Sequence, residues 1–72
     1  MAIYRAKLKE GQEYIELGNL IKHVGLISTG GAIKEFLLVN EVKVNGIDEN
    51  RRGRKIRSGD IVEIEEDQII VE

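Results

Sequence analysis

The 72-residue sequence contains no cysteine and no proline, and His23 is its only histidine. Without cysteine, neither a disulfide framework nor a thiolate zinc site can form. His23 has no serine or cysteine partner nearby in the sequence, so a nucleophilic catalytic site is not indicated. The acids at positions 63–67 lack the glycine and the spacing of a calcium loop. We therefore expect no enzyme activity, no cofactor and no metal.

Long apolar segments are also missing. Residues 1–5 lack the apolar core of a signal peptide, and no stretch approaches the roughly 20 apolar residues of a membrane span. There is no internal repeat, low-complexity tract or linker. We expect one domain over residues 1–72, soluble and cytoplasmic. A chain of this length buries only about 60% of its unfolded surface, so its stability depends on good packing.

Two stretches carry apolar residues at helical spacing. The first predicts a helix over residues 17–24, because its apolar positions fall at i, i+3, i+4 and i+7: Leu17, Leu20, Ile21 and Val24. Gly18 weakens this helix by about 1 kcal/mol relative to alanine. Gly25 is suited to the left-handed position that follows a helix end.

The second predicted helix begins near Ser28 or Thr29, either of which can cap it. Lys34 and Glu35 are expected to face water, and Asn40 is expected to end the helix in a left-handed conformation. The apolar stripe of this helix is expected to pack against the first helix in the core, and it consists of Ala32, Ile33, Phe36 and Leu37.

Alternating apolar residues predict strands at 3–8, 42–44, 61–64 and 68–71. Asn45-Gly46 is a strong signal for a tight turn, and Ser58-Gly59-Asp60 predicts a second turn. Asp67 and its neighbours are expected to turn the chain between the last two strands. The order is one strand, two helices and three strands, which favours an α+β fold over a parallel α/β sheet.

The charges are segregated along the chain. The net charge is −2, yet residues 51–57 hold five of the 11 Lys and Arg residues, and residues 60–72 hold six acids and no base. A local positive surface can bind phosphate on a protein that is acidic overall. Two interpretations stay open: this basic segment binds RNA, or its bases pair with Asp48, Glu49 and the acids after residue 60.

Other features refine the RNA hypothesis. Lys34 and Lys22 could extend a basic patch, although each alone is typical of an ordinary surface lysine. Residues 28–31, Ser-Thr-Gly-Gly, could hold an anion or simply begin a helix, and they lack the Gly-Lys-Ser/Thr ending of a P-loop. The two tyrosines and one phenylalanine suggest no row of stacking rings, so shape and phosphate recognition of a folded RNA fits better than single-strand recognition.

Three stretches together resemble a known family: residues 29–37 (TGGAIKEFL), residues 42–46 (VKVNG) and residues 56–64 (IRSGDIVEI). They are similar to the S-four RNA-binding domain, also called the alpha-L RNA-binding motif, with a motif core at about 15–64. The nearest likeness is to the short stand-alone bacterial members of the YaaA type, which share the run Asn-Arg-Arg-Gly-Arg-Lys at 50–55.

The resemblance implies two packed helices against a small, strongly bent, mainly antiparallel sheet. It also implies non-catalytic binding of structured RNA, ribosomal or transfer RNA, through the second helix and the loop before the Gly-Asp turn. This chain has Gly30 where many members carry arginine, which shifts the expected contacts toward the loop. The expected RNA contacts are Arg51, Arg52, Arg54, Lys55, Arg57, Lys34 and Lys43.

Two alternatives remain on sequence alone. Val-Asn-Gly followed by Gly-Asp also occurs in β-grasp carrier or regulatory domains, but the sequence ends Ile70-Val71-Glu72 and not in the Gly-Gly of a sulfur carrier. A protein-interaction module that docks an acidic partner through the basic segment is the other alternative.

Overall fold

The computed structural model describes residues 1–72, except for the burial of Gly30. Short helices and strands are joined by turns and loops along the chain. In order, the elements are β1 (Ile3–Ala6), β2 (Ile15–Glu16), α1 (Leu17–His23), the 3-10 turn η1 (Gly30–Ala32), α2 (Ile33–Val39), β3 (Val42–Val44), β4 (Ile47–Asp48), β5 (Lys55–Ile56), β6 (Ile61–Ile64) and β7 (Asp67–Val71).

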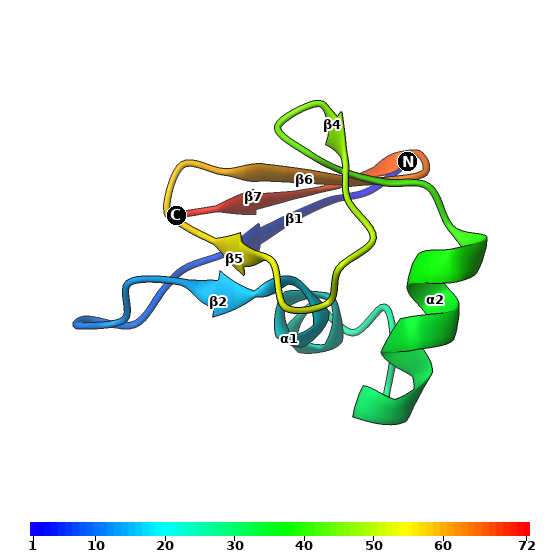
Figure 1. Ribbon diagram of the computed structural model, residues 1–72. Helices are drawn as coiled ribbons and strands as arrows, with labels where there is room; N and C mark the ends of the chain where they lie inside the picture. Colours follow the sequence, from blue (N-terminus) through cyan, green and yellow to red (C-terminus); the bar gives the residue numbers. More distant parts are fainter.

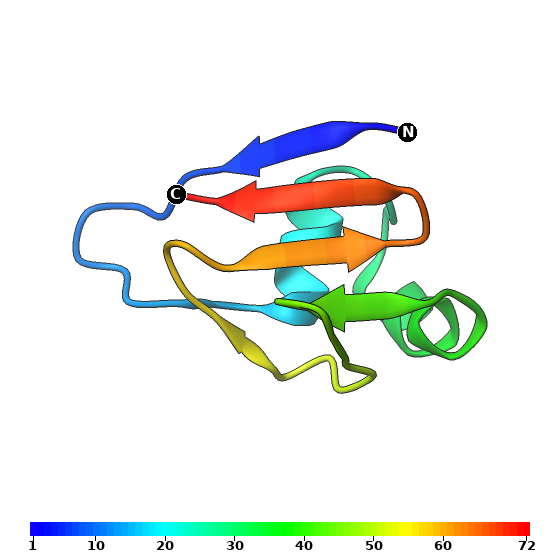
Figure 2. The same ribbon diagram turned by 90° about the horizontal axis from the view of Figure 1, so that it is seen from above.

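Five strands form the main sheet in the order β1-β7-β6-β3-β4, and β2 pairs with β5 in a separate two-stranded sheet. All neighbours are antiparallel except β1 and β7. Both helices lie on the same side of the main sheet, and β2 and β5 lie on that side as well (Figure 1). Seen from above, α1 crosses behind the central strands (Figure 2). The predicted α+β fold with a mainly antiparallel sheet is confirmed.

The core lies between the helices and the sheet. Alternation along the strands turns Val62 and Ile64 of β6 inward, together with Ile69 and Val71 of β7. The full set of buried apolar residues is Ala6, Leu17, Leu20, Ile21, Ile33, Leu37, Val42, Val44, Ile56, Val62, Ile64, Ile69 and Val71. The first predicted stripe is confirmed, with Val24 packed at its margin. In the second stripe Phe36 is only half-buried and Ala32 is exposed, because Ala32 belongs to η1.

The end of α1 follows the prediction closely. Gly25 has φ +88°, the left-handed conformation expected after the helix. Its N–H donates to the Lys22 carbonyl over 3.0 Å, and the Leu26 N–H donates to the Ile21 carbonyl over 3.2 Å. These two hydrogen bonds form a Schellman motif, which satisfies carbonyls that the helix end leaves free.

Both ends of α2 differ from the prediction. Asn40 is extended, with φ −112° and ψ 144°, because β3 begins two residues later. Its backbone N–H and its side-chain amide both donate to the Phe36 carbonyl over 3.0 Å. At the other end the helix is entered through η1, where the Ala32 N–H donates to the Thr29 carbonyl over 3.3 Å. The N-cap position of α2 is held by Ala32, and not by Ser28 or Thr29 as predicted, because η1 lies between these residues and the helix.

The strand predictions were right in place and less accurate at their ends. β1 ends at Ala6, earlier than expected, and β7 begins at Asp67. The turn before β7 is made by residues 65–66, and Glu65 takes the positive φ of 53°. The strands β2, β4 and β5 were not predicted, because two residues are too few to show an alternating pattern.

Both predicted turns are present, and hydrogen bonds join them. Asn45 and Gly46 have φ of 52° and 82°, as a type I′ turn between β3 and β4 requires. The Asn45 amide donates to Asp60 over 2.9 Å, and the Asn45 side-chain oxygen accepts the Ile61 N–H over 2.9 Å. The second turn has its positive φ at Gly59, at +93°. The two turns therefore hold each other in place.

We predict that Gly59→Ala destabilises the protein while Gly31→Ala does not. An added Cβ meets nothing within 4 Å at either glycine, but only Gly59 has a positive φ. The strain of a side chain in this conformation costs roughly 1 to 2 kcal/mol, or about 4 to 16 °C in Tm for a domain of this size. Thermal unfolding followed by circular dichroism measures both variants, and equal Tm values for the two would contradict the prediction.

Candidate nucleic-acid interface

The basic segment, residues 51–57, is anchored to the start of α1 by its own backbone. The Leu17 N–H donates to the Arg54 carbonyl over 2.8 Å, and the Gly18 N–H donates to the Arg52 carbonyl over 2.9 Å. Glu16, at the N-cap of α1, makes no side-chain cap hydrogen bond. The two carbonyls therefore satisfy N–H groups that the first turn of a helix leaves free, and they orient the basic segment relative to α1.

Gly18 allows this close approach. A Cβ at this position would lie 3.1 Å from Ile33 Cγ1 and 3.4 Å from Arg52 Cβ. The sequence indicated only that Gly18 weakens the helix. In the structure, the missing side chain lets α1, α2 and the basic segment meet at one point, so the segment lies against both helices.

Glu49 is a buried carboxylate just before the basic segment, with 7% of its side chain exposed. It receives three hydrogen bonds from Arg51: from the backbone N–H over 3.1 Å, from Nε over 2.9 Å and from Nη2 over 3.1 Å. Arg54 Nη1 donates a fourth over 3.2 Å. The backbone N–H of Glu49 donates to the Val42 carbonyl of β3 over 2.9 Å. Glu49 thus ties the basic segment to the main sheet.

The hydrogen bonds from the Arg51 side chain lower the pKa of Glu49, and further contributions from Arg51 and Arg54 outweigh the opposing effect of burial. The result is a pKa of about 2, against an ordinary value of 4.5. Glu49 is therefore fully ionised at neutral pH. One part of the pairing hypothesis is confirmed by these contacts, since bases of the segment do pair with Glu49.

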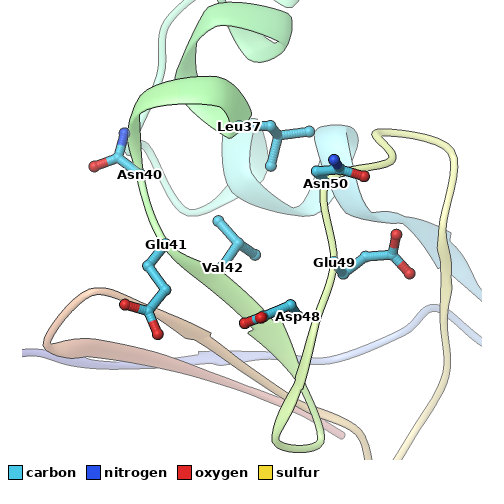
Figure 3. A pocket seen from close by; sticks show the side chains of 7 residues that line it. All are labelled: Leu37, Asn40, Glu41, Val42, Asp48, Glu49 and Asn50. Carbon is cyan, nitrogen blue, oxygen red and sulfur yellow. The ribbon is translucent and has the colours of Figure 1, made fainter.

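Asp48 does not take part in this pairing. A hollow of about 320 Å³ lies beside β3 and is lined by Leu37, Asn40, Glu41, Val42, Asp48, Glu49 and Asn50. Figure 3 shows the carboxylate of Glu49 directed away from those of Glu41 and Asp48. Glu49 points toward the basic segment, while the other two acids leave this hollow negatively charged and unsuited to phosphate.

Six of the seven predicted RNA contacts border three connected hollows. Arg52 lines one of about 450 Å³ with Lys34, and another of about 360 Å³ with Lys22, Gly53 and one acid, Glu16. Gly53 also lines a third hollow of about 520 Å³, whose other lining residues are Arg51, Arg54, Lys55 and Arg57. We call this surface the basic face. Its cations come from α1, α2 and the basic segment.

Lys43 is not part of the basic face. It alternates with the buried Val42 and Val44 on β3, so its side chain points away from the core and the helices. Its Nζ lies 3.2 Å from Glu41. The hydrogen bond to Glu41, with the charges of Glu41, Asp48 and Glu63, raises its pKa above the ordinary value. Lys43 is thus surrounded by acids on the opposite face of the sheet.

The position of Arg57 is set by Asp60. The Arg57 N–H donates to Asp60 over 2.7 Å, and the Asp60 N–H donates back to the Arg57 carbonyl over 3.0 Å. Partial burial raises the pKa of Asp60, but hydrogen bonds from Arg57 and Asn45 and the nearby charges of Arg54 and Arg57 bring it below the ordinary value. The Gly-Asp turn therefore positions the last arginine of the basic segment.

Tyr14 is a neighbour of the basic segment that the sequence did not indicate. Its ring centroid lies 5.0 Å from Lys55 Nζ and 5.8 Å from Arg57 Cζ. The antiparallel pairing of β2 with β5, which places Ile15 opposite Ile56, brings these side chains together. No sequence pattern could have shown this pairing, because both strands are only two residues long.

Among the residues that the structure describes, no three His, Cys, Asp or Glu side chains are grouped so that they could hold a metal ion. None of the described helices has the length and apolar character needed to cross a membrane.

We predict that Glu49→Gln lowers the free energy of unfolding at pH 7 by about 1.5 to 3 kcal/mol, because charge-assisted hydrogen bonds are lost from a buried site. The folded-state pKa of Glu49 is depressed, so its contribution is present above about pH 4.5 and is lost as the pH falls toward 2. Urea unfolding should show the gap between wild type and variant narrowing over that range. Glu66→Gln, at an exposed acid, is the control, and a pH-independent gap for Glu49→Gln would contradict the prediction.

Comparison with known proteins agrees with this architecture. The profile of the S4 domain family matches residues 7–72. The "Probable ribosome maturation protein RlbA" of Bacillus subtilis (strain 168) is 51% identical over 53 residues, which cover 74% of this chain and 75% of that relative. No solved structure gave a significant match. The resemblance to the S-four family is thereby confirmed, and the chain belongs to the S4 domain family.

Proposed function

We propose that this chain binds structured RNA through its basic face, without catalysing a reaction. The observation that carries the proposal is the gathering of six predicted contacts with Lys22 around connected hollows, although the chain as a whole is acidic. Arginine presents a planar fork of donors that matches phosphate oxygens, and lysine adds a point charge. S4 domains generally bind RNA, which supports the same assignment.

The cations of the basic face have two roles in this proposal. Arg51 and Arg54 use some of their N–H groups to hydrogen-bond Glu49, and these bonds fix the conformation of the basic segment. Arg52, Lys55, Arg57 and Lys34 are exposed and form none of the ion pairs found among the described residues. These four are the principal phosphate contacts. Lys43 has the least favourable position of the seven, because it is already paired with Glu41.

The relative named for ribosome maturation points to the class of RNA. We propose ribosomal RNA as the physiological ligand, bound during maturation of a ribosomal particle in the cytoplasm. Transfer RNA has the same phosphate backbone and serves as the comparison ligand. Docking of an acidic protein on the same face remains the second candidate, since it would use the same charges.

We predict that Lys34→Ala combined with Arg52→Ala weakens RNA binding and lowers its salt dependence. Each phosphate contact contributes roughly 0.7 to 0.9 to the slope of log K against log salt, so the double variant should lose about 1.4 to 1.8. Fluorescence anisotropy with ribosomal and transfer RNA over a salt series measures this. Lys43→Ala, which removes one cation outside the basic face, is the control and should leave the slope unchanged.

Two results would overturn the proposal: wild type that binds neither RNA at low salt, or a double variant whose slope equals that of wild type. Circular dichroism of all variants separates loss of binding from loss of folding. A loss of slope in Lys43→Ala about half as large as in the double variant would mean that overall charge, and not the basic face, determines binding.

We also predict that the chain sediments with ribosomal subunits at low salt and is released as the salt concentration rises. Sucrose-gradient fractions probed for the tagged chain test this, with the Lys34→Ala and Arg52→Ala double variant as a control that should leave the ribosomal fractions at lower salt. Binding to ribosomal protein that persists after complete digestion of the RNA would favour the protein-docking alternative.

A further inference from the structure

Tyr14 lies beside the basic face, directly before the short strand β2. Its side chain is exposed by 37%, while Ile15 packs against the core and its partner Ile56 is fully buried. The ring is therefore open to a ligand, and the residue that follows it is held by pairing with β5. The neighbouring cations of Lys55 and Arg57 lie within 6 Å of the ring centroid.

The contacts between these cations and the ring leave the charges available. Exposed cation–π contacts contribute only about 0.5 to 1 kcal/mol. Neither Lys55 nor Arg57 has a carboxylate partner among the ion pairs of the described residues. Both side chains can thus contact phosphate while the ring keeps an accessible surface.

The chemistry of this group suits a nucleotide rather than phosphate alone. The Tyr14 hydroxyl can donate one hydrogen bond to a phosphate, but only the ring can stack on the flat apolar face of a nucleobase. Bases inside a duplex are already stacked on their neighbours and cannot reach the ring. Only an unpaired nucleotide can bring its base onto Tyr14 and its phosphates to Lys55 and Arg57.

We propose that Tyr14, Lys55 and Arg57 form a site for one unpaired nucleotide of the bound RNA. This proposal rests on the proposed function and adds the RNA feature that the chain selects. The helix α2, which carries Lys34, and the strand β5, which carries Lys55, lie on different sides of α1 in both views (Figures 1 and 2). The preferred ligand is therefore a junction, with paired RNA at Lys34 and Arg52 and an unpaired nucleotide at Tyr14.

The test compares two RNAs that differ only in unpaired nucleotides: a blunt duplex and the same duplex with a three-nucleotide overhang. Wild type should bind the overhang RNA more tightly, by about five- to hundredfold, as one stacked base contributes. Tyr14→Leu should abolish this preference without changing the binding of the blunt duplex or its salt slope. Tyr14→Phe keeps the ring and should retain the preference.

A spectroscopic measurement covers the case in which Tyr14→Leu fails to fold. The chain has two tyrosines, Tyr4 and Tyr14, so Tyr14 is the only tyrosine left in a Tyr4→Phe variant. Its fluorescence should be quenched by the overhang RNA and not by the blunt duplex. Equal quenching by both RNAs, or none by either when both bind, would overturn the proposal.

The outcomes also separate this inference from the proposed function. If wild type binds the blunt duplex with strong salt dependence but shows no preference for the overhang, the nucleotide site is wrong and phosphate-led binding stands. If a folded Tyr14→Leu weakens both RNAs equally, the ring has no selective contact with the overhang, and the inference fails. If wild type binds neither RNA, the proposed function itself fails.

Discussion

The burial of the Glu49 carboxylate beneath Arg51 and Arg54 is the interaction on which the basic face depends. Five cations in seven residues repel one another, and a segment of that composition would otherwise stay extended in water. One ionised acid with four hydrogen bonds offsets this repulsion and ties the segment to β3. The Arg52 and Arg54 carbonyls then dock on α1, so a charged stretch becomes a defined surface.

The distribution of charged residues over the two sides of the main sheet explains how an acidic protein presents a basic face. Lys43 is surrounded by Glu41, Asp48 and Glu63 on the far side of the sheet, while the cations of the basic face lie on the helix side. The cations of the basic face attract a polyanion to the helix side, and the acids around Lys43 are too far from that surface to cancel them. The low net charge is therefore compatible with phosphate binding.

The Val-Asn-Gly turn and the Gly-Asp turn are joined by hydrogen bonds and act together in this chain. Asn45 in the Val-Asn-Gly turn bonds to Asp60 and Ile61 at the Gly-Asp turn. Asp60 in turn holds the backbone of Arg57. The pair of motifs thus closes the sheet and sets the end of the basic segment with the same few hydrogen bonds, which gives a physical reason for their occurrence together.

The sequence by itself determined the two helices, the longer strands, the glycine turns and the clustering of charge, because each depends on residues close together in the chain. Helical spacing located Leu17 and Leu20 correctly, and Asn45-Gly46 formed the expected turn. Only the tertiary structure decided that Glu49 is buried, that the basic segment lies on the face of the sheet opposite Lys43, and that Tyr14 meets Lys55. The pairings responsible, β2 with β5 and β3 with β6, join residues far apart in sequence, and no local pattern records them.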